Sequence, residues 1–171
     1  MWCCLVGSEM CIRDSIQTLQ VDKSDDILFI DAQSHRNLEL TRNLNGDTTH
    51  TLLSALDETQ TPMGARLLSQ WINHPTRDQK QLNTRLDIVE AFYQTGEYAT
   101  LQPLLRQMGD MARILSRVAL LTARPRDLVA LREGLATLPS LQASLAPYDE
   151  PAIQALMAQL STHPDIQALL S

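Results

Sequence analysis

Cysteine, glycine and long apolar runs are scarce in this chain of 171 residues, and each shortage excludes a class of protein. The cysteines are confined to Cys3, Cys4 and Cys11, so residues 16–171 contain neither a disulfide framework nor a cysteine nucleophile. The 6 glycines form no G-x-x-x-x-G-K-[ST] and no G-x-G-x-x-G motif, which excludes a phosphate-binding loop of either type. No window approaches about 18 consecutive apolar residues, so we expect no transmembrane helix and no membrane partner.

Metal ligands and acid–base pairs are also lacking. No two of the 4 histidines are three or four residues apart, so no helix face presents a pair of imidazoles. The neighbouring carboxylates are Asp25/Asp26, Asp57/Glu58 and Asp149/Glu150. Adjacent residues on a helix do not face each other, which favours solvated or capping roles for these acids. We therefore predict no catalytic, no cofactor-binding and no metal-binding residue in this chain.

The charged residues are unusual in two ways: arginine greatly outnumbers lysine, and many of the arginines are clustered. The net charge is −6, which argues against a nucleic-acid binder that relies on a basic surface alone. All cations except Lys23 and Lys80 are arginines, and arginine suits fixed, planar ion pairs. Residues 106–132 hold six arginines and two acids, a local net charge of +4.

Two interpretations of this arginine cluster remain open. Arg113 and Arg117 lie four residues apart, where like charges repel unless a carboxylate lies opposite them. The scarcity of lysine favours ion pairs between helices or domains. The alternative is a phosphate contact, or a signal relay to a partner domain.

The first fifteen residues differ from the rest of the chain. Residues 7–15 resemble translated vector or adapter sequence, and the stretch lacks the basic and long apolar regions of a signal peptide. We interpret residues 1–15 as a non-native or disordered leader. An ordinary variable N-terminus is the alternative.

The remaining pattern predicts a mainly α fold of antiparallel helices, a bundle or an elongated lever, with one short β segment near the N-terminus. Residues 26–31 form an apolar run between acids that predicts a strand or the end of one, and a helix is expected over residues 32–44. Predicted helix starts are Thr61-Pro62, Asp78 and Asp110, and predicted ends are His74-Pro75 and Gly96.

The C-terminal third is expected to consist of shorter helical pieces. Arg124-Pro125 separates two helices, and the region beyond is expected to be divided by Pro139, Pro147, Pro151 and Pro164. The expected domains are the leader, a connector end over residues 16–31 and a helical core over residues 32–171. Because Ile166, Leu169 and Leu170 have no following partner, we expect the core to be truncated.

Several segments together resemble the connector-to-core region of the MutS family of mismatch-recognition ATPases. The most specific block is residues 57–78, whose kernel Met-Gly-x-Arg-Leu-Leu-x-x-Trp begins at Met63. Residues 31–40, 85–89, 110–117 and 124–128 follow the family's order. The pattern is closest to that of the bacterial members. One departure is Ala112, where the family usually has a glutamate that could pair with a neighbouring arginine.

The resemblance implies a part of a dimeric clamp on DNA that starts mismatch repair. The full-length protein would bind ATP and Mg²⁺ and act as a DNA-dependent ATPase, although no such residue matches in this chain. The implied partners are mismatched DNA, a second subunit and MutL, in the bacterial cytoplasm at the nucleoid. This fragment would be the structural core, ending before the clamp and coupling the DNA-binding and ATPase domains. Its candidate hinges are the helix of residues 61–72, in which Gly64 permits close approach, and the helix of Arg113 and Arg117. Changes at Arg66 or Arg117 are expected to alter the coupling.

Two other functions remain compatible with the residues. One is a helical scaffold or adaptor that binds protein partners through an acidic surface. The other is a MutS-related protein of recombination or ribosome rescue, which shares the core but not the mismatch reader.

Overall fold

The computed structural model describes residues 26–170, and these residues are almost entirely helical, which confirms the predicted mainly α fold. The expected leader and residues 16–25 of the expected connector end lie outside the described residues. In chain order the helices are α2 (Ala32–Asn37), α3 (Leu52–Leu56), α4 (Pro62–Asn73), α5 (Gln79–Thr95), α6 (Tyr98–Gln107), α7 (Met111–Ala119), α8 (Pro125–Leu145), α9 (Pro151–Gln159) and α10 (Pro164–Leu169).

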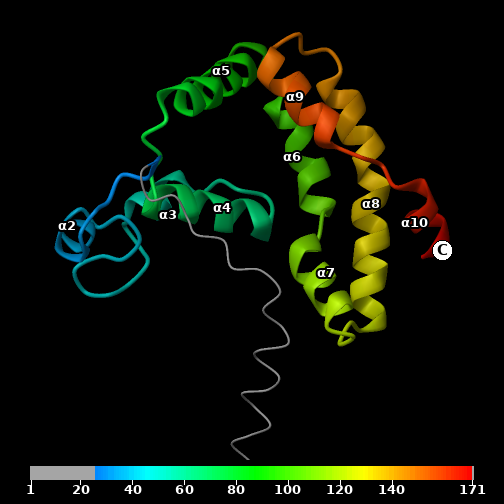
Figure 1. Ribbon diagram of the computed structural model, residues 1–171, viewed down its shortest axis with the longest axis horizontal. Coiled ribbons are helices and arrows are strands. Elements are labelled where there is room, and N and C mark those ends of the chain that lie inside the picture. Colours follow the sequence, from blue (N-terminus) through cyan, green and yellow to red (C-terminus); the bar gives the residue numbers. More distant parts are fainter. Residues whose placement is uncertain (1–25, 171) are drawn as a thin grey trace, which may run out of the picture.

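The helices form two parts joined by α5 (Figure 1). We call residues 26–77, with α2 to α4, the N-terminal lobe, and residues 98–170, with α6 to α10, the bundle. Within the bundle, α6 and α7 follow one another along α8 and run antiparallel to it, and α9 and α10 return beside α8 (Figure 1). Helix α5 packs on α9, and the ring of Phe92 meets that of Tyr148, in the linker before α9, edge to face with the ring centroids 5.0 Å apart.

Most predicted helix ends are confirmed because they depend on local hydrogen bonds. The Thr61 side chain accepts from the backbone N–H of Gly64, and Pro62 occupies the first turn of α4. Asp78 caps α5, which ends at Gly96 in the left-handed conformation at φ 68°. Asp110 caps α7, and its side chain accepts from the backbone N–H of Arg113. Each cap satisfies N–H groups that a helix start otherwise leaves unpaired.

The N-terminal lobe differs from the predicted pattern in two places. The β segment over residues 26–31 is reduced, within the described residues, to one antiparallel bridge between Ile27 and Thr76. The helix expected over residues 32–44 is wrong in length, since α2 ends at Asn37. Glu39 adopts a positive φ of 47°, and its carboxylate accepts from the backbone N–H of Leu44, which turns the chain away from the helix axis.

The hydrophobic core lies in the bundle. Its most buried members are Ile114, Leu131, Leu135, Leu138 and Leu141. Partly buried side chains from α6, α7 and the C-terminal segment pack around them. Gly134 lets α7 approach α8, because a Cβ on Gly134 would lie 3.4 Å from the sulfur of Met111. The core therefore ties α6, α7 and α8 into one layer.

Pro139 is expected from the sequence to divide this region, and that prediction is wrong. Helix α8 continues through Pro139 to Leu145. Proline removes one backbone hydrogen bond and crowds the preceding turn. Leu138 and Leu141 on either side are buried in the core, and their burial holds the helix in place against that cost.

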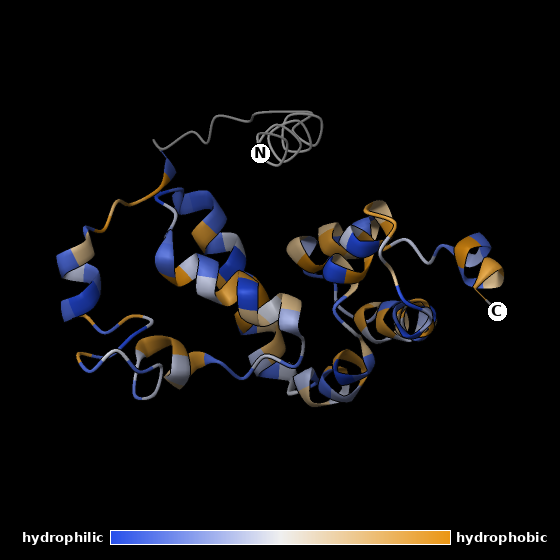
Figure 2. Cartoon of the chain, turned by 90° about the horizontal axis from the view of Figure 1, so that it is seen from below, coloured by the Kyte–Doolittle hydropathy of each residue, from blue (hydrophilic) through white to orange (hydrophobic). Residues whose placement is uncertain are grey.

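Apolar stripes on α4 and α5 are more exposed than their periodicity suggests. Hydrophobic and hydrophilic residues alternate along the helices (Figure 2). Trp71, interpreted as a core residue, is 39% exposed, and Leu86 on α5 is 63% exposed. Periodicity identifies the apolar side of a helix but not the element that covers it. Within residues 26–170, none of the helices combines the length and the apolar character needed to cross a bilayer.

Candidate inter-helix coupling site

Asp110 lies where the N-terminal lobe meets the bundle. It follows Gly109, whose position close to Ala130 brings the α6–α7 linker against α8. Its side chain is 16% exposed and caps α7 through the backbone N–H of Arg113. The local sequence thus fixes a carboxylate at the start of α7, with one edge turned toward α4.

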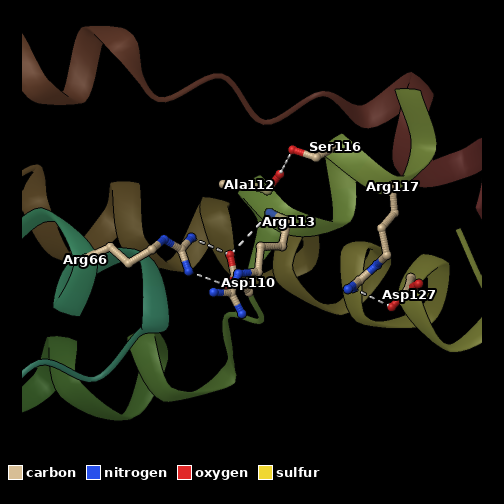
Figure 3. Close-up of polar contacts among 7 residues, drawn as sticks. All are labelled: Arg66, Asp110, Ala112, Arg113, Ser116, Arg117 and Asp127. Atoms are coloured by element: carbon tan, nitrogen blue, oxygen red, sulfur yellow. Dashed lines mark hydrogen bonds and ion pairs between the residues drawn. The ribbon is translucent and has the colours of Figure 1, made fainter. Parts of the chain in front are cut away.

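Arg66 of α4 reaches across to this carboxylate. Its two terminal nitrogens bind the two oxygens of Asp110 at 2.6 and 2.7 Å, in a bidentate pair (Figure 3). Such a pair has directional as well as electrostatic character. It joins residues 44 positions apart in the sequence and links the two parts of the molecule.

The electrostatic state of this site follows from the same contacts. The hydrogen bonds from Arg66, helped by the N–H of Arg113, lower the pKa of Asp110 to about 2 from its usual 3.8. In turn, Asp110 raises the pKa of Arg66. Asp110 is therefore ionised and Arg66 protonated at neutral pH, so the pair is permanently charged there.

The opposite end of α7 is held in a similar way. Arg117 donates from Nη2 to Asp127 of α8 at 2.7 Å (Figure 3). The other oxygen of Asp127 accepts from the backbone N–H of Arg124 at 2.9 Å. That backbone hydrogen bond, together with Arg117, lowers the pKa of Asp127. Asp127 thus caps the start of α8 and binds α7 at once.

The interpretation of the arginine cluster as inter-helix ion pairing is confirmed for Arg117 and Asp127. Arg113 also finds a carboxylate, with its Nε 3.4 Å from Asp110. The two like charges at four-residue spacing face different acids, although Arg113 shares Asp110 with Arg66, so their mutual repulsion is offset. The Arg113 side chain is 69% exposed, which makes its contact the weaker of the two.

A second polar contact connects the lobe to the bundle. Arg106 of α6 donates from Nε to the side-chain carbonyl of Gln60 at 2.5 Å. A third contact braces α5 against α4, where the guanidinium of Arg85 lies 3.8 Å from the centre of the Trp71 ring. A cation over an indole face is an attractive arrangement, and it covers part of the exposed ring of Trp71.

Gly64 lies against the loop that caps its own helix. A Cβ at this position would meet Thr61 Oγ1 at 3.0 Å and Thr59 at 3.5 Å, which belong to the loop that caps the same helix. Within this chain the glycine therefore makes room for its own N-cap. Gly134 allows a close approach between α7 and α8, and an isolated glycine within a helical pattern is the signal that could have identified it.

The dual role of Asp110 was also not anticipated, although its capping was. The sequence marks it as a helix start, but its partner Arg66 comes from a distant helix. Ala112, where a glutamate was expected from the family pattern, is exposed in the first turn of α7 (Figure 3). Arg113 and Arg117 both find a carboxylate without one there, although the Nε of Arg117 is buried without a hydrogen-bond partner.

The polar contacts of this site connect one helix to two others. Among residues 26–170, no group of three or more His, Cys, Asp or Glu side chains could hold a metal ion. The site instead provides a helix, α7, tied at its start to α4 and at its end to α8.

One comparison with known proteins bears on this geometry. A family model described as MutS domain III matches residues 33–171. The matched range includes α3 to α10 and all of α2 except its first residue.

Proposed function

Because the chain belongs to the MutS family of DNA mismatch repair proteins, we propose that its helical part is the structural core that couples DNA binding to ATP hydrolysis. MutS proteins interact with DNA, and this chain shares that general function. The coupling role is supported by the charged pairs that bind α7 to α4 of the N-terminal lobe and to α8 of the bundle.

This proposal rests mainly on the two ion pairs at the ends of α7. Arg66 and Asp110 fix its start to the N-terminal lobe at 2.6 Å, and Arg117 fixes its end to Asp127 of α8 at 2.7 Å. Between them, Ile114 is 3% exposed and packs in the core. A close-packed layer resists gradual deformation, so a displacement of α4 would shift α7 and α8 together.

ATP and Mg²⁺ belong to the proposal only through other domains of the full-length protein. The chain has no phosphate-binding loop, and residues 26–170 hold no cluster of metal ligands, so the residues present do not fit either group. We assign no chemical step to this chain. We also propose, from the family resemblance, a homodimer that works with MutL in the bacterial cytoplasm at the nucleoid.

Coupling can be measured as the factor by which ATP changes the affinity for mismatched DNA in the full-length protein. Typical coupling energies are about 1–3 kcal/mol. We expect Arg66→Ala and Arg117→Ala to reduce this factor several-fold, while the affinity for each ligand alone changes much less. Arg36→Ala is the matched control, since Arg36 is exposed and forms no ion pair among the described residues. Unchanged coupling in folded Arg66 and Arg117 variants would contradict the proposal.

The same experiment addresses the alternative of recombination or ribosome rescue. Mismatched and fully paired duplexes are compared under identical conditions. A full-length protein that shows no preference for the mismatch would favour the MutS-related alternative, even if ATP and DNA binding remain coupled.

A further inference from the structure

The loop between α2 and α3 contains the one asparagine of the chain that is followed by glycine. Asn45 precedes Gly46, whereas leucine, histidine or threonine follows each of the other asparagines. Both residues are exposed, and the loop projects away from the bundle (Figure 1). The side chain of Asn45 forms no hydrogen bond within residues 26–170, so its amide is open to chemical attack.

Glycine matters here because its backbone nitrogen is the nucleophile in the deamidation of a preceding asparagine. After the nitrogen of Gly46 loses its proton to hydroxide, it attacks Cγ of Asn45. An N–C bond forms, the Cγ–Nδ2 bond breaks, and ammonia leaves with a proton from water. Water then opens either C–N bond of the cyclic imide, which leaves aspartate or isoaspartate without any oxidation or reduction. Nothing shields the nitrogen, since a Cβ built on Gly46 would have no neighbour within 4 Å.

In the folded chain a turn built around Asn43 restrains this reaction. Its Oδ1 accepts from the backbone N–H groups of Asn45 and Asp47 at 3.0 and 2.9 Å. Its Nδ2 donates to the carbonyl of Thr49 at 3.2 Å. The N–H of Gly46 donates to the carbonyl of Asn43 at 2.9 Å, so this nitrogen is free neither to lose its proton nor to rotate toward the Asn45 side chain. The turn must therefore open before the imide can form.

The turn can open without unfolding of the rest of the lobe. The two ends of the loop are joined separately, by backbone hydrogen bonds from Leu52 to Glu39 at 3.1 Å and from Leu53 to Leu40 at 2.9 Å. Leu40 is 8% exposed, whereas all of residues 44–50 are exposed. Exposed backbone hydrogen bonds with few apolar contacts around them open at low free energy. The rate of imide formation is therefore a property of the turn and not of global unfolding.

We propose that Asn45 deamidates in this protein and that the hydrogen bonds of Asn43 set the rate. The carboxylate so formed shares a cleft of about 490 Å³ with Arg36 and Arg42, and no acidic side chain lines this cleft. The new charge therefore meets cations and no like charge there. Isoaspartate also adds one carbon to the backbone, which breaks the spacing of the turn. The inference is independent of the proposed coupling function, since it needs neither ATP nor DNA.

Incubation of the purified chain at mildly alkaline pH, followed by mass spectrometry, tests the proposal. Trypsin releases residues 43–66, which contain both Asn43 and Asn45, and fragmentation shows which of the two has exchanged its amide for a heavier carboxyl group. A sample digested before incubation gives the background. We expect conversion at Asn45, while Asn43, which precedes leucine, keeps its amide. A folded chain that converts both equally, or that leaves Asn45 intact for weeks while the denatured chain converts, overturns the proposal.

The variant Asn43→Ala tests the role of the turn. It removes three hydrogen bonds and leaves Asn45 and Gly46 in place, so we expect deamidation to be roughly three- to tenfold faster. Asn43→Asp retains an oxygen that can accept from both N–H groups and should restore most of the protection. Asn83→Ala, at an exposed position of α5, is the matched control and should leave the rate unchanged. Equal rates in Asn43→Ala and the original chain, or acceleration in the control, overturn the assignment.

Rates in guanidinium chloride separate the turn from the intrinsic chemistry of the sequence. The turn is absent there, so the original chain and both Asn43 variants should deamidate at one rate, faster than the folded original chain. Circular dichroism without denaturant shows that each variant is folded. A difference between the variants that persists in denaturant would mean that residue 43 acts on the reaction directly. A folded original chain as fast as the denatured one would mean that the turn gives no protection, and either result overturns the proposal.

Discussion

The N-terminal lobe and the bundle are built from similar helices but are held together by different forces. In the bundle the buried hydrophobic residues are Ile114, Leu131, Leu135, Leu138, Leu141, Tyr148 and Ile153. In the described part of the lobe, the residues that reach the same burial are Leu40 and Thr51. The bundle therefore has a hydrophobic core, whereas the N-terminal lobe is held mainly by hydrogen bonds and helix caps.

The polar connections of the lobe are individually modest. His35 and Asn73 share a side-chain hydrogen bond of 2.7 Å, and Leu28 donates its backbone N–H to the carbonyl of Pro75 at 2.8 Å. Each such bond contributes about 0.5–1.5 kcal/mol net. The lobe should therefore open locally at a lower free energy than the bundle, as regions with few buried apolar contacts do.

The largest loss of stability is expected when a core side chain of the bundle is removed. Leu135 is 4% exposed, and Leu135→Ala should lower the free energy of unfolding by about 2–5 kcal/mol, because it leaves a cavity. Leu56→Ala in the lobe, where the side chain is 54% exposed, should cost less than about 1 kcal/mol. Urea unfolding followed by circular dichroism gives both values. Equal losses at the two positions would show that the lobe has a core after all.

The junction of the two parts should give the next largest effect. Asp110→Ala removes the cap of α7 and the ion pair to Arg66, and we expect a loss of about 1–2 kcal/mol. Asp110→Asn retains an oxygen that can cap the helix and loses the charge. The asparagine variant should therefore be more stable than the alanine variant in the same unfolding experiment. If the two are equal, the cap contributes nothing measurable and the ion pair accounts for the whole loss.

Acid should weaken the same junction. The pKa of Asp110 is lowered to about 2 in the folded chain, so its ionised form contributes stability above its usual pKa of 3.8. That contribution is lost as pH falls from about 4 toward 2, as the carboxylate becomes protonated in the folded state. The stability difference between the original chain and Asp110→Asn should be smaller at pH 3 than at pH 7. An unchanged difference would mean that Arg66 does not hold the carboxylate ionised in solution.

The smallest expected effect is a gain at the start of α7. Ala112→Glu places a negative charge in the first helical turn, where the helix dipole favours it, and should add about 0.3–1 kcal/mol. The melting temperature measured at low and high salt checks this, because a dipole interaction is screened. A loss of stability would indicate that repulsion from Asp110 outweighs the dipole.

Local features of the fold were predictable and distant contacts were not. The caps at Thr61, Asp78 and Asp110 were identified correctly because each depends on atoms within three residues. The lengths of α2 and α8 were missed because a positive φ at Glu39 and core burial around Pro139 decided them.

The coupling site shows the same contrast between predictable local contacts and unpredictable distant ones. Pairing of the arginine cluster between helices could be inferred from spacing and from the shortage of lysine. That Arg117 binds Asp127 ten residues away was within reach of that reasoning. That Arg66 binds Asp110 was not, because no sequence pattern relates residues 44 positions apart without the fold.

The length of α8 has a mechanical consequence. Its 21 residues correspond to a rod of about 30 Å. Asp127 anchors one end to α7, while Leu145 lies at the other end, beside α9. A tilt of about 3° at the anchored end displaces the far end by about 1.6 Å, within the roughly 1–2 Å helix shifts that accompany switching in other proteins. A small change of angle at one ion pair thus becomes a displacement large enough to repack a distant interface.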